Sequence, residues 1–246
     1  GTVNFAPGSQ FAGSGSVSSA TITGTLTVTS GSFTNVTLSN ASNLTIQPGS
    51  LQIAGNFTNS GIVTLLGNGT VGTASLTIDS NGTTLNGGGT IVLTNGTYSR
   101  ISGGNLTNID NTIRGAGSIS SNLINQGALI AEGGSITLNS DVDSTGGTVT
   151  VAANGTLSVG STLTGGTITT SSTSRITGSG TLANVTLNTC SAWTIPAGTS
   201  SPTLAGTFTN KGTITILGNS TVGTASLNLS SNGTTLNGGG TIIASN

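Results

Sequence analysis

The 246-residue chain has very few charged side chains, and it contains neither histidine nor methionine. Charged residues make up 4% of the chain, against roughly 25% in an average soluble domain, and the formal net charge is −1. Nucleic acids and anionic membrane surfaces are bound through clusters of Lys and Arg. Because the chain has only four basic residues, we expect no nucleic-acid partner.

Cysteine, aromatic residues and long apolar runs are also scarce. Cys190 is the only cysteine, so an intrachain disulfide is impossible. Aromatic residues make up 3% of the chain. No apolar run approaches the roughly 20 residues that a membrane-spanning helix needs. We therefore expect no membrane span.

The residues that are present alternate between polar and apolar. Val, Ile and Leu recur two apart with Thr, Ser or Asn between them, a pattern that puts one face of a strand inward and the other outward. The regular apolar residues and the low net charge also argue against disorder. No segment shows helical spacing, so we expect an all-β fold. The clearest segments are Thr21–Thr29, Asn43–Gln47, Ile62–Leu66, Thr148–Ala152 and Thr213–Leu217.

A long internal repeat organises the chain. Residues 56–91 match residues 207–242 at a constant offset of 151, and GTASLTIDSNGTTLNGGGTI at Gly72–Ile91 returns with three changes. A looser match relates Phe33–Leu38 to Leu182–Leu187, at an offset of 149. Self-similarity of this kind is typical of repeat arrays. We therefore interpret residues 1–246 as one β-solenoid that contains a 151-residue repeat.

The segments between the strands favour a parallel β-solenoid. Gly-Gly-Thr, Asn-Gly-Thr and Pro-Gly sequences supply the positive φ angles of bends. Asn-Gly could equally form two-residue hairpins, which would give an antiparallel sandwich or barrel. Strands of about four to five residues and closely spaced corners favour the solenoid, with roughly 12 coils. Its core would contain Val, Ile, Leu and the Phe side chains, and Asn and Thr ladders would follow the corners and outer faces.

One segment resembles a known family. Leu106–Ala131 (LTNIDNTIRGAGSISSNLINQGALIA), together with the Asn-x-Gly sequences at Asn59, Asn125 and Asn210, is similar to the repeats of large secreted bacterial haemagglutinin-type adhesins and autotransporter passengers. The resemblance implies a right-handed parallel β-helix that is secreted or displayed at the cell surface. It supplies no catalytic residues. It implies a structural or adhesive rod, with host or environmental surface glycans as partners.

The ionisable residues do not form a recognisable catalytic pattern. Solenoid enzymes that cleave polysaccharides need clustered carboxylates, yet Asp79 is replaced by Ser230 in the other copy of the repeat. We therefore predict no enzyme activity, no catalytic or metal-binding residues and no cofactor. Asp141 and Asp143 could donate two calcium ligands, but a site needs about six to eight, so a solvated turn is favoured. The residues considered are Asp79, Arg100, Asp110, Arg114, Glu132, Asp141, Asp143, Arg175 and Lys211.

Two further expectations concern individual side chains. Asp110 and Arg114 could form an ion pair across a corner, which we interpret as structural. Trp193 takes the place of Leu44 in the looser repeat, so we expect it to fill the core or a corner and not to stack on a sugar.

A ligand-binding solenoid, with an ice-binding or carbohydrate-binding face, is the alternative to a structural rod. Ice binding would need Thr-x-Thr in register on successive coils, and the Thr-x-Thr pairs of this chain are irregularly spaced. They begin at Thr21, Thr27, Thr148, Thr167 and Thr213.

The ends of the sequence lead to an expectation about assembly. Thr241–Asn246 corresponds to Thr90–Asn95, where the first copy of the repeat runs on into another coil. A solenoid end has unpaired backbone groups and needs a cap. We expect the chain to continue covalently in a longer array or to associate end to end into a filament.

Overall fold

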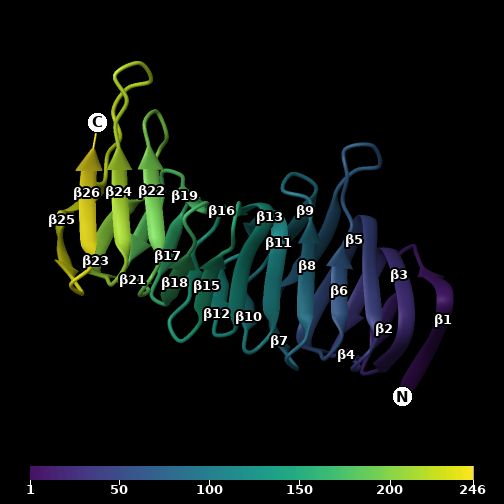
Figure 1. The fold of residues 1–246 in the computed structure, drawn as a ribbon. Coiled ribbons are helices and arrows are strands. Elements are labelled where there is room, and N and C mark those ends of the chain that lie inside the picture. Colours follow the sequence, from purple (N-terminus) through teal and green to yellow (C-terminus); the bar gives the residue numbers. More distant parts are fainter. Residues whose placement is uncertain (246) are drawn as a thin grey trace.

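The computed structural model describes residues 1–245 and consists of parallel strands wound into a β-solenoid of about 11 turns (Figure 1). No helix occurs among these residues. The named strands of these residues pair only in parallel. Two single bridges outside the strands, Asn68 to Gly72 and Asn219 to Gly223, are antiparallel. The solenoid prediction is confirmed, and the antiparallel sandwich is wrong. At about 4.8 Å per turn, the rod is about 53 Å long.

The turns have three sides, which we call faces 1, 2 and 3, and each face is a ladder of stacked strands. Face 1 contains β2 (Ser16–Ser18), β9 (Ser99–Gly103), β16 (Thr156–Val159) and β19 (Arg175–Thr177). It is followed by β22 (Ala192–Pro196), β24 (Thr213–Leu217) and β26 (Thr241–Ser245). Face 2 contains β4 (Thr37–Leu38), β10 (Leu106–Asn108), β12 (Leu123–Asn125), β14 (Val142–Asp143), β17 (Thr162–Thr164) and β20 (Thr181–Ala183). Face 3 contains β6 (Ile62–Leu65), β8 (Thr90–Thr94), β15 (Thr148–Val151), β18 (Thr167–Thr170) and β21 (Thr186–Leu187).

Several strands are longer than predicted because they run across a corner from one face to the next. These strands are β1 (Thr2–Phe11), β3 (Thr21–Thr34), β5 (Asn43–Asn59), β7 (Ala74–Asn86), β11 (Thr112–Ser120), β13 (Ala128–Leu138), β23 (Thr203–Asn210) and β25 (Asn228–Asn237). In β5, two glycines with positive φ, Gly49 (141°) and Gly55 (66°), turn the backbone. Only a residue without a Cβ reaches such angles cheaply, so the chain bends while its pairing with the next turn continues.

The core is a continuous column of apolar side chains. It extends from Ile22 to Ile214, and Phe33, Phe57 and Phe208 are buried in it as predicted. Trp193 is also buried, and its Nε1 donates a hydrogen bond to Ile176 O at 3.1 Å. The expectation that Trp193 fills the core is confirmed. Since the column has no interruption, each turn buries its apolar side chains against those of the turns on either side.

Asparagine side chains line the inside of the rod as well as its surface. On the surface, Asn122 Nδ2 donates to Asn105 Oδ1 one turn away at 3.3 Å, as the predicted outer ladders require. Inside, Asn108 Nδ2 donates to Asn125 Oδ1 at 2.8 Å, and both residues are fully buried. The sequence did not predict buried asparagines. They are tolerated because each amide finds partners in its own and adjacent turns.

The Asn-x-Gly sequences build one type of corner. The buried Asn59 Oδ1 accepts a hydrogen bond from Gly61 N at 3.2 Å, while Asn59 Nδ2 donates to Thr90 O in the next turn at 3.3 Å. A Cβ at position 61 would lie 2.3 Å from Ser42 O, so only glycine fits. Asn210 and Gly212 repeat this arrangement, with distances of 3.1 Å to Gly212 N and 3.2 Å to Thr241 O. The corner therefore requires both residues of the motif.

The two copies of the 151-residue repeat lie on different faces of the rod. The ladder through Asn56 on face 2 passes Thr84, Thr107, Ile124, Asp143, Thr164 and Ala183, and it reaches Ala205 seven turns later. Thr207, the counterpart of Asn56, lies past the next corner in the ladder of Thr186–Leu187 and β18, which is face 3. Equivalent residues of the two copies are thus separated by seven turns plus one face of the rod.

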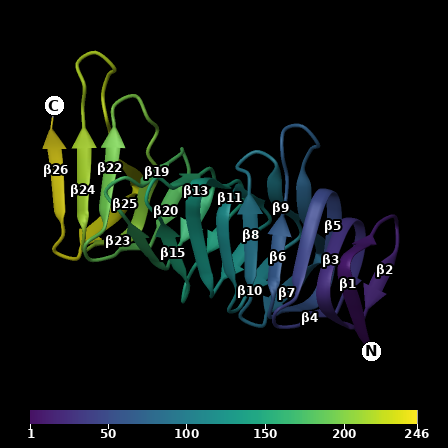
Figure 2. The same ribbon diagram turned by 45° about the vertical axis from the view of Figure 1, so that its right-hand side comes forward.

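The twist of the rod offsets this change of face. β6 and β8 belong to face 3, whereas their counterparts β24 and β26 follow face 1. Figures 1 and 2 nevertheless show both pairs on the same side of the rod, with their arrows in the same direction. Stacked strands twist steadily relative to one another. Over seven turns this twist rotates face 1 to the side of the rod that face 3 occupies at the first copy. The sequence comparison matched Thr241–Asn246 with Thr90–Asn95. Asn246, the last residue of that match, lies outside the described residues.

Candidate functional site

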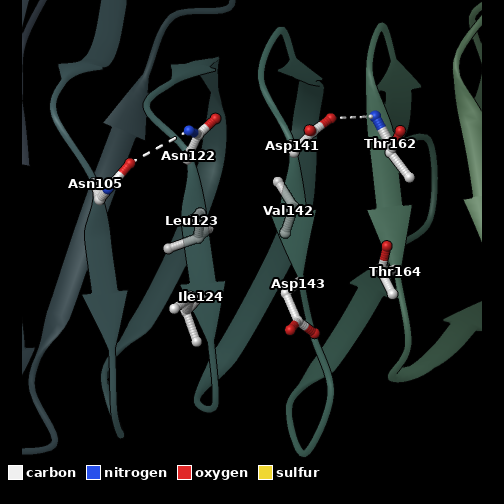
Figure 3. A pocket seen from close by; sticks show the side chains of 9 residues that line it. All are labelled: Asn105, Asn122, Leu123, Ile124, Asp141, Val142, Asp143, Thr162 and Thr164. Carbon is white, nitrogen blue, oxygen red and sulfur yellow. Dashed lines mark hydrogen bonds between the residues drawn. The ribbon is translucent and has the colours of Figure 1, made fainter.

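The candidate site is a groove on the outside of face 2, between β10 and β17 (Figure 3). Its volume is about 410 Å³. Four successive turns contribute to it, and alternate residues of each short strand face outward. The lining residues are Asn105, Asn122, Leu123, Ile124, Asp141, Val142, Asp143, Thr162 and Thr164.

Asp141 is fixed at one end of this groove by two hydrogen bonds. Its Oδ1 accepts from Ser161 Oγ at 2.5 Å and from Thr162 N at 3.1 Å. These bonds, chiefly the one from Ser161, hold the pKa of the Asp141 carboxyl below its usual value. A general acid needs the opposite shift, towards neutral pH. Asp141 is therefore suited to accept hydrogen bonds as a carboxylate.

Asp143 lies further along the groove, on the same outer face as Asp141 (Figure 3). One of its oxygens, Oδ1, accepts from Thr145 N at 2.9 Å and so stabilises the turn after β14. Ile124, which is exposed, lies beside Asp143 in the adjacent turn. Carboxylate oxygens beside an apolar side chain can accept hydrogen bonds from hydroxyl groups and pack against a carbon skeleton. The groove therefore presents carboxylate oxygens beside an apolar side chain on the surface of the rod.

The sequence analysis interpreted Asp141 and Asp143 as a solvated turn and did not predict the groove. Asn105, Asn122 and Ile124 come from turns that are 17 to 38 positions earlier in the chain. The coil period could have brought them together, because Asn122 follows Asn105 by 17 residues and Asp141 follows Asn122 by 19. Those periods vary from turn to turn, so the register was not evident before the fold was known.

Five other ionisable residues have structural partners outside the groove: Asp79, Arg100, Asp110, Arg114 and Glu132. Arg114 forms an ion pair with Glu132 in the next turn, Nε to Oε1 at 2.5 Å. The predicted pair of Arg114 with Asp110 is wrong, because Arg114 lies on face 3 in register with Ile130 while Asp110 lies at the preceding corner. Asp110 Oδ1 instead accepts from Gly88 N at 3.0 Å.

Asp79 and Arg100 also stabilise neighbouring segments. Asp79 Oδ1 accepts from the backbone N and the Nδ2 of Asn81, both at 2.9 Å. Arg100 Nε donates to Ser118 Oγ at 3.3 Å. These contacts explain how Ser230 can replace Asp79 in the second copy, since Ser230 Oγ accepts from Asn232 N at 3.3 Å.

Within residues 1–245, no group of three or more His, Cys, Asp or Glu side chains is placed to hold a metal ion. Asp141 and Asp143 by themselves supply two of the roughly six to eight oxygen ligands that a calcium ion takes. The same part of the chain has no helix that is long and apolar enough to cross a membrane.

The outward threonines form an interrupted array. On face 3, Thr148 and Thr150 pair in register with Thr167 and Thr169 of the next turn. In the preceding turns the equivalent outward residues are Ala128 and Ile130, and then Thr112 and Arg114. An ice-binding surface needs a regular array, so this face does not favour the ice-binding alternative.

Comparison with known proteins identified no relative: no family model, curated protein or solved structure matches this chain.

Proposed function

We propose that this chain is a structural or adhesive rod segment of a bacterial protein that is secreted or displayed at the cell surface. The observation that carries the proposal is the uninterrupted core of stacked apolar side chains through the rod. Such a fold extends by adding turns and transmits load along its axis, because each turn pairs with the next through backbone hydrogen bonds. The rod would lengthen by covalent continuation or by end-to-end association of chains.

The surface chemistry supports the same role. The chain has nine charged side chains, and those at Asp79, Asp110, Arg114 and Glu132 are occupied in holding corners or adjacent turns together. The lowered pKa of Asp141 favours hydrogen-bond acceptance over acid catalysis. We therefore propose that the protein is not an enzyme.

Surface labelling of the source cells tests this proposal. Antibodies raised against residues 1–246 should label intact, unpermeabilised cells or precipitate the protein from the culture medium. An antibody against a cytoplasmic protein serves as the control for lysis. Labelling that requires permeabilised cells, with no protein in the medium, would contradict the proposal.

Carbohydrate binding at the face 2 groove is a second candidate function. The specific observation is the combination of two outward carboxylates, Asp141 and Asp143, with the exposed Ile124. Titration calorimetry with neutral oligosaccharides should show binding that is lost in Asp143→Asn and kept in Asp79→Asn, whose carboxylate lies outside the groove. Absence of binding by the unchanged protein would contradict this candidate and leave the rod function untouched.

A further inference from the structure

Two small hairpins with the same structure project from the rod. Hairpin 1 comprises residues 67–73 and hairpin 2 comprises residues 218–224. Their sequences, GNGTVGT and GNSTVGT, differ only at Gly69 and Ser220. Hairpin 1 follows β6 after Leu66, and hairpin 2 follows β24, the counterpart of β6, directly.

The same hydrogen bonds hold both hairpins closed. In hairpin 1, Asn68 and Gly72 exchange two backbone hydrogen bonds at 3.0 and 2.9 Å. In hairpin 2, Asn219 and Gly223 exchange two bonds at 3.1 and 2.8 Å. Each asparagine Oδ1 also accepts from two backbone amides at the tip, at distances between 2.8 and 3.1 Å. Both loops are therefore ordered before any partner binds, which lowers the entropy lost on binding.

Each hairpin holds a valine in the solvent. Val71 is 67% exposed and Val222 is 62% exposed, the two highest values among the large apolar side chains of the rod. No charged residue occurs in either hairpin. A single exposed apolar side chain needs no explanation, but two rigid loops with the same exposed valine form a repeated contact surface.

The two hairpins face the same way. Figures 1 and 2 show the loops after β6 and β24 projecting from the same side of the rod. Seven turns plus one face separate them, which corresponds to about 35 Å along the axis. The change of face alone would have pointed them in different directions, and the twist of the rod restores their alignment.

We propose that the hairpins are a bivalent contact surface for a second copy of this chain, laid alongside the first. A partner that engages both tips at once must carry two uncharged, apolar contacts with the same spacing. A second copy meets this condition because its own hairpins have that period. Two-fold symmetry would then make both contacts together, and the second would form at a high effective concentration. The low net charge of −1 places no electrostatic barrier between two copies. This inference requires only the fold and goes beyond the proposed rod function.

Sedimentation equilibrium of residues 1–246 with Cys190→Ser tests the proposal, and the substitution removes thiol cross-linking. We expect a concentration-dependent dimer. The double variant Val71→Asp, Val222→Asp should weaken it by about ten-fold or more, because the contact would bury unpaired carboxylates. The dimer affinity of each single variant should lie between that of the double variant and that of the unchanged protein.

Ile109→Asp is the matched control, since Ile109 is an exposed apolar residue at a corner outside the hairpins. It should leave the dimer unchanged, and circular dichroism should show the same strand content in all variants. Electron microscopy should show rods paired side by side. Three results would overturn the proposal: a monomer at all concentrations, association that is equally weakened by Ile109→Asp, or rods joined only end to end.

Discussion

The two copies of the 151-residue repeat have nearly the same sequence but lie on different faces of the rod. β6 of the first copy pairs within face 3, and β24 of the second copy follows face 1. Both form parallel strands in which Val63 and its counterpart Ile214 are buried, while Leu65 is buried and its counterpart Ile216 is half-buried. The three faces are therefore interchangeable for a strand of alternating Thr, Val, Ile and Leu. The corners and hairpins distinguish one part of a turn from another.

Replacement of a buried asparagine should have the largest effect on the stability of the rod. Asn59→Ala would leave Gly61 N, Thr90 O and Asn111 Oδ1 without their present partner, and we expect it to reduce the free energy of unfolding by about 3 kcal/mol. Asn210→Ala loses the two equivalent contacts within the second copy, to Gly212 N and Thr241 O, and should cost about 1 kcal/mol less. Urea unfolding of both variants measures the difference.

A larger loss for Asn210→Ala than for Asn59→Ala would contradict the comparison. It would mean that the third contact of Asn59, at 2.9 Å to Asn111 Oδ1, does not stabilise the first copy.

Replacement of the corner glycine should lower the stability equally in the two copies. Gly61→Ala and Gly212→Ala would place a Cβ 2.3 Å from Ser42 O and 2.4 Å from Ser191 O, respectively. Since neither glycine has a positive φ, the penalty is steric, and we expect a loss of about 2 kcal/mol for each. Thermal unfolding gives the measurement. Gly96→Ala is the control, because the nearest atom would lie at 3.6 Å, and it should change stability by less than about 0.5 kcal/mol. Clearly unequal losses at positions 61 and 212 would show that the corners are not equivalent.

Replacement of Asp141, which lies in the turns between the two copies, should have the smallest effect on stability. Its pKa is lower in the folded protein than in the unfolded chain. Its contribution is therefore present above the unfolded pKa, about 3.9, and is lost as the pH falls through the folded value. Because the carboxylate is exposed, the contribution at neutral pH should be below about 1 kcal/mol.

Asp141→Asn should thus lower the urea midpoint slightly at pH 7 and leave it unchanged in strong acid. An equal loss at both pH values would show that the stabilisation does not depend on ionisation of Asp141.

The sequence predicted the fold well because alternation and corner residues are local signals. Strands such as β6 and β15 and the buried Phe57 follow from period-two patterns. The groove was not predicted, since Asp141 and Asp143 were interpreted as a solvated turn and since Ile124 and Asp143 meet through a coil period that varies along the chain. The Arg114 and Glu132 pair was missed for the same reason, as its partners lie one turn apart. The change of face between the copies could not be foreseen, because it depends on the total number of corners in 151 residues.

The alignment of the two hairpins tests this account most directly. Spin labels at Thr70→Cys and Thr221→Cys, in a Cys190→Ser background and diluted with unlabelled protein, should be separated by about 35 Å, as seven turns plus one face on a twisted rod require. A clearly longer distance, as for hairpins on opposite sides of the rod, would contradict the account.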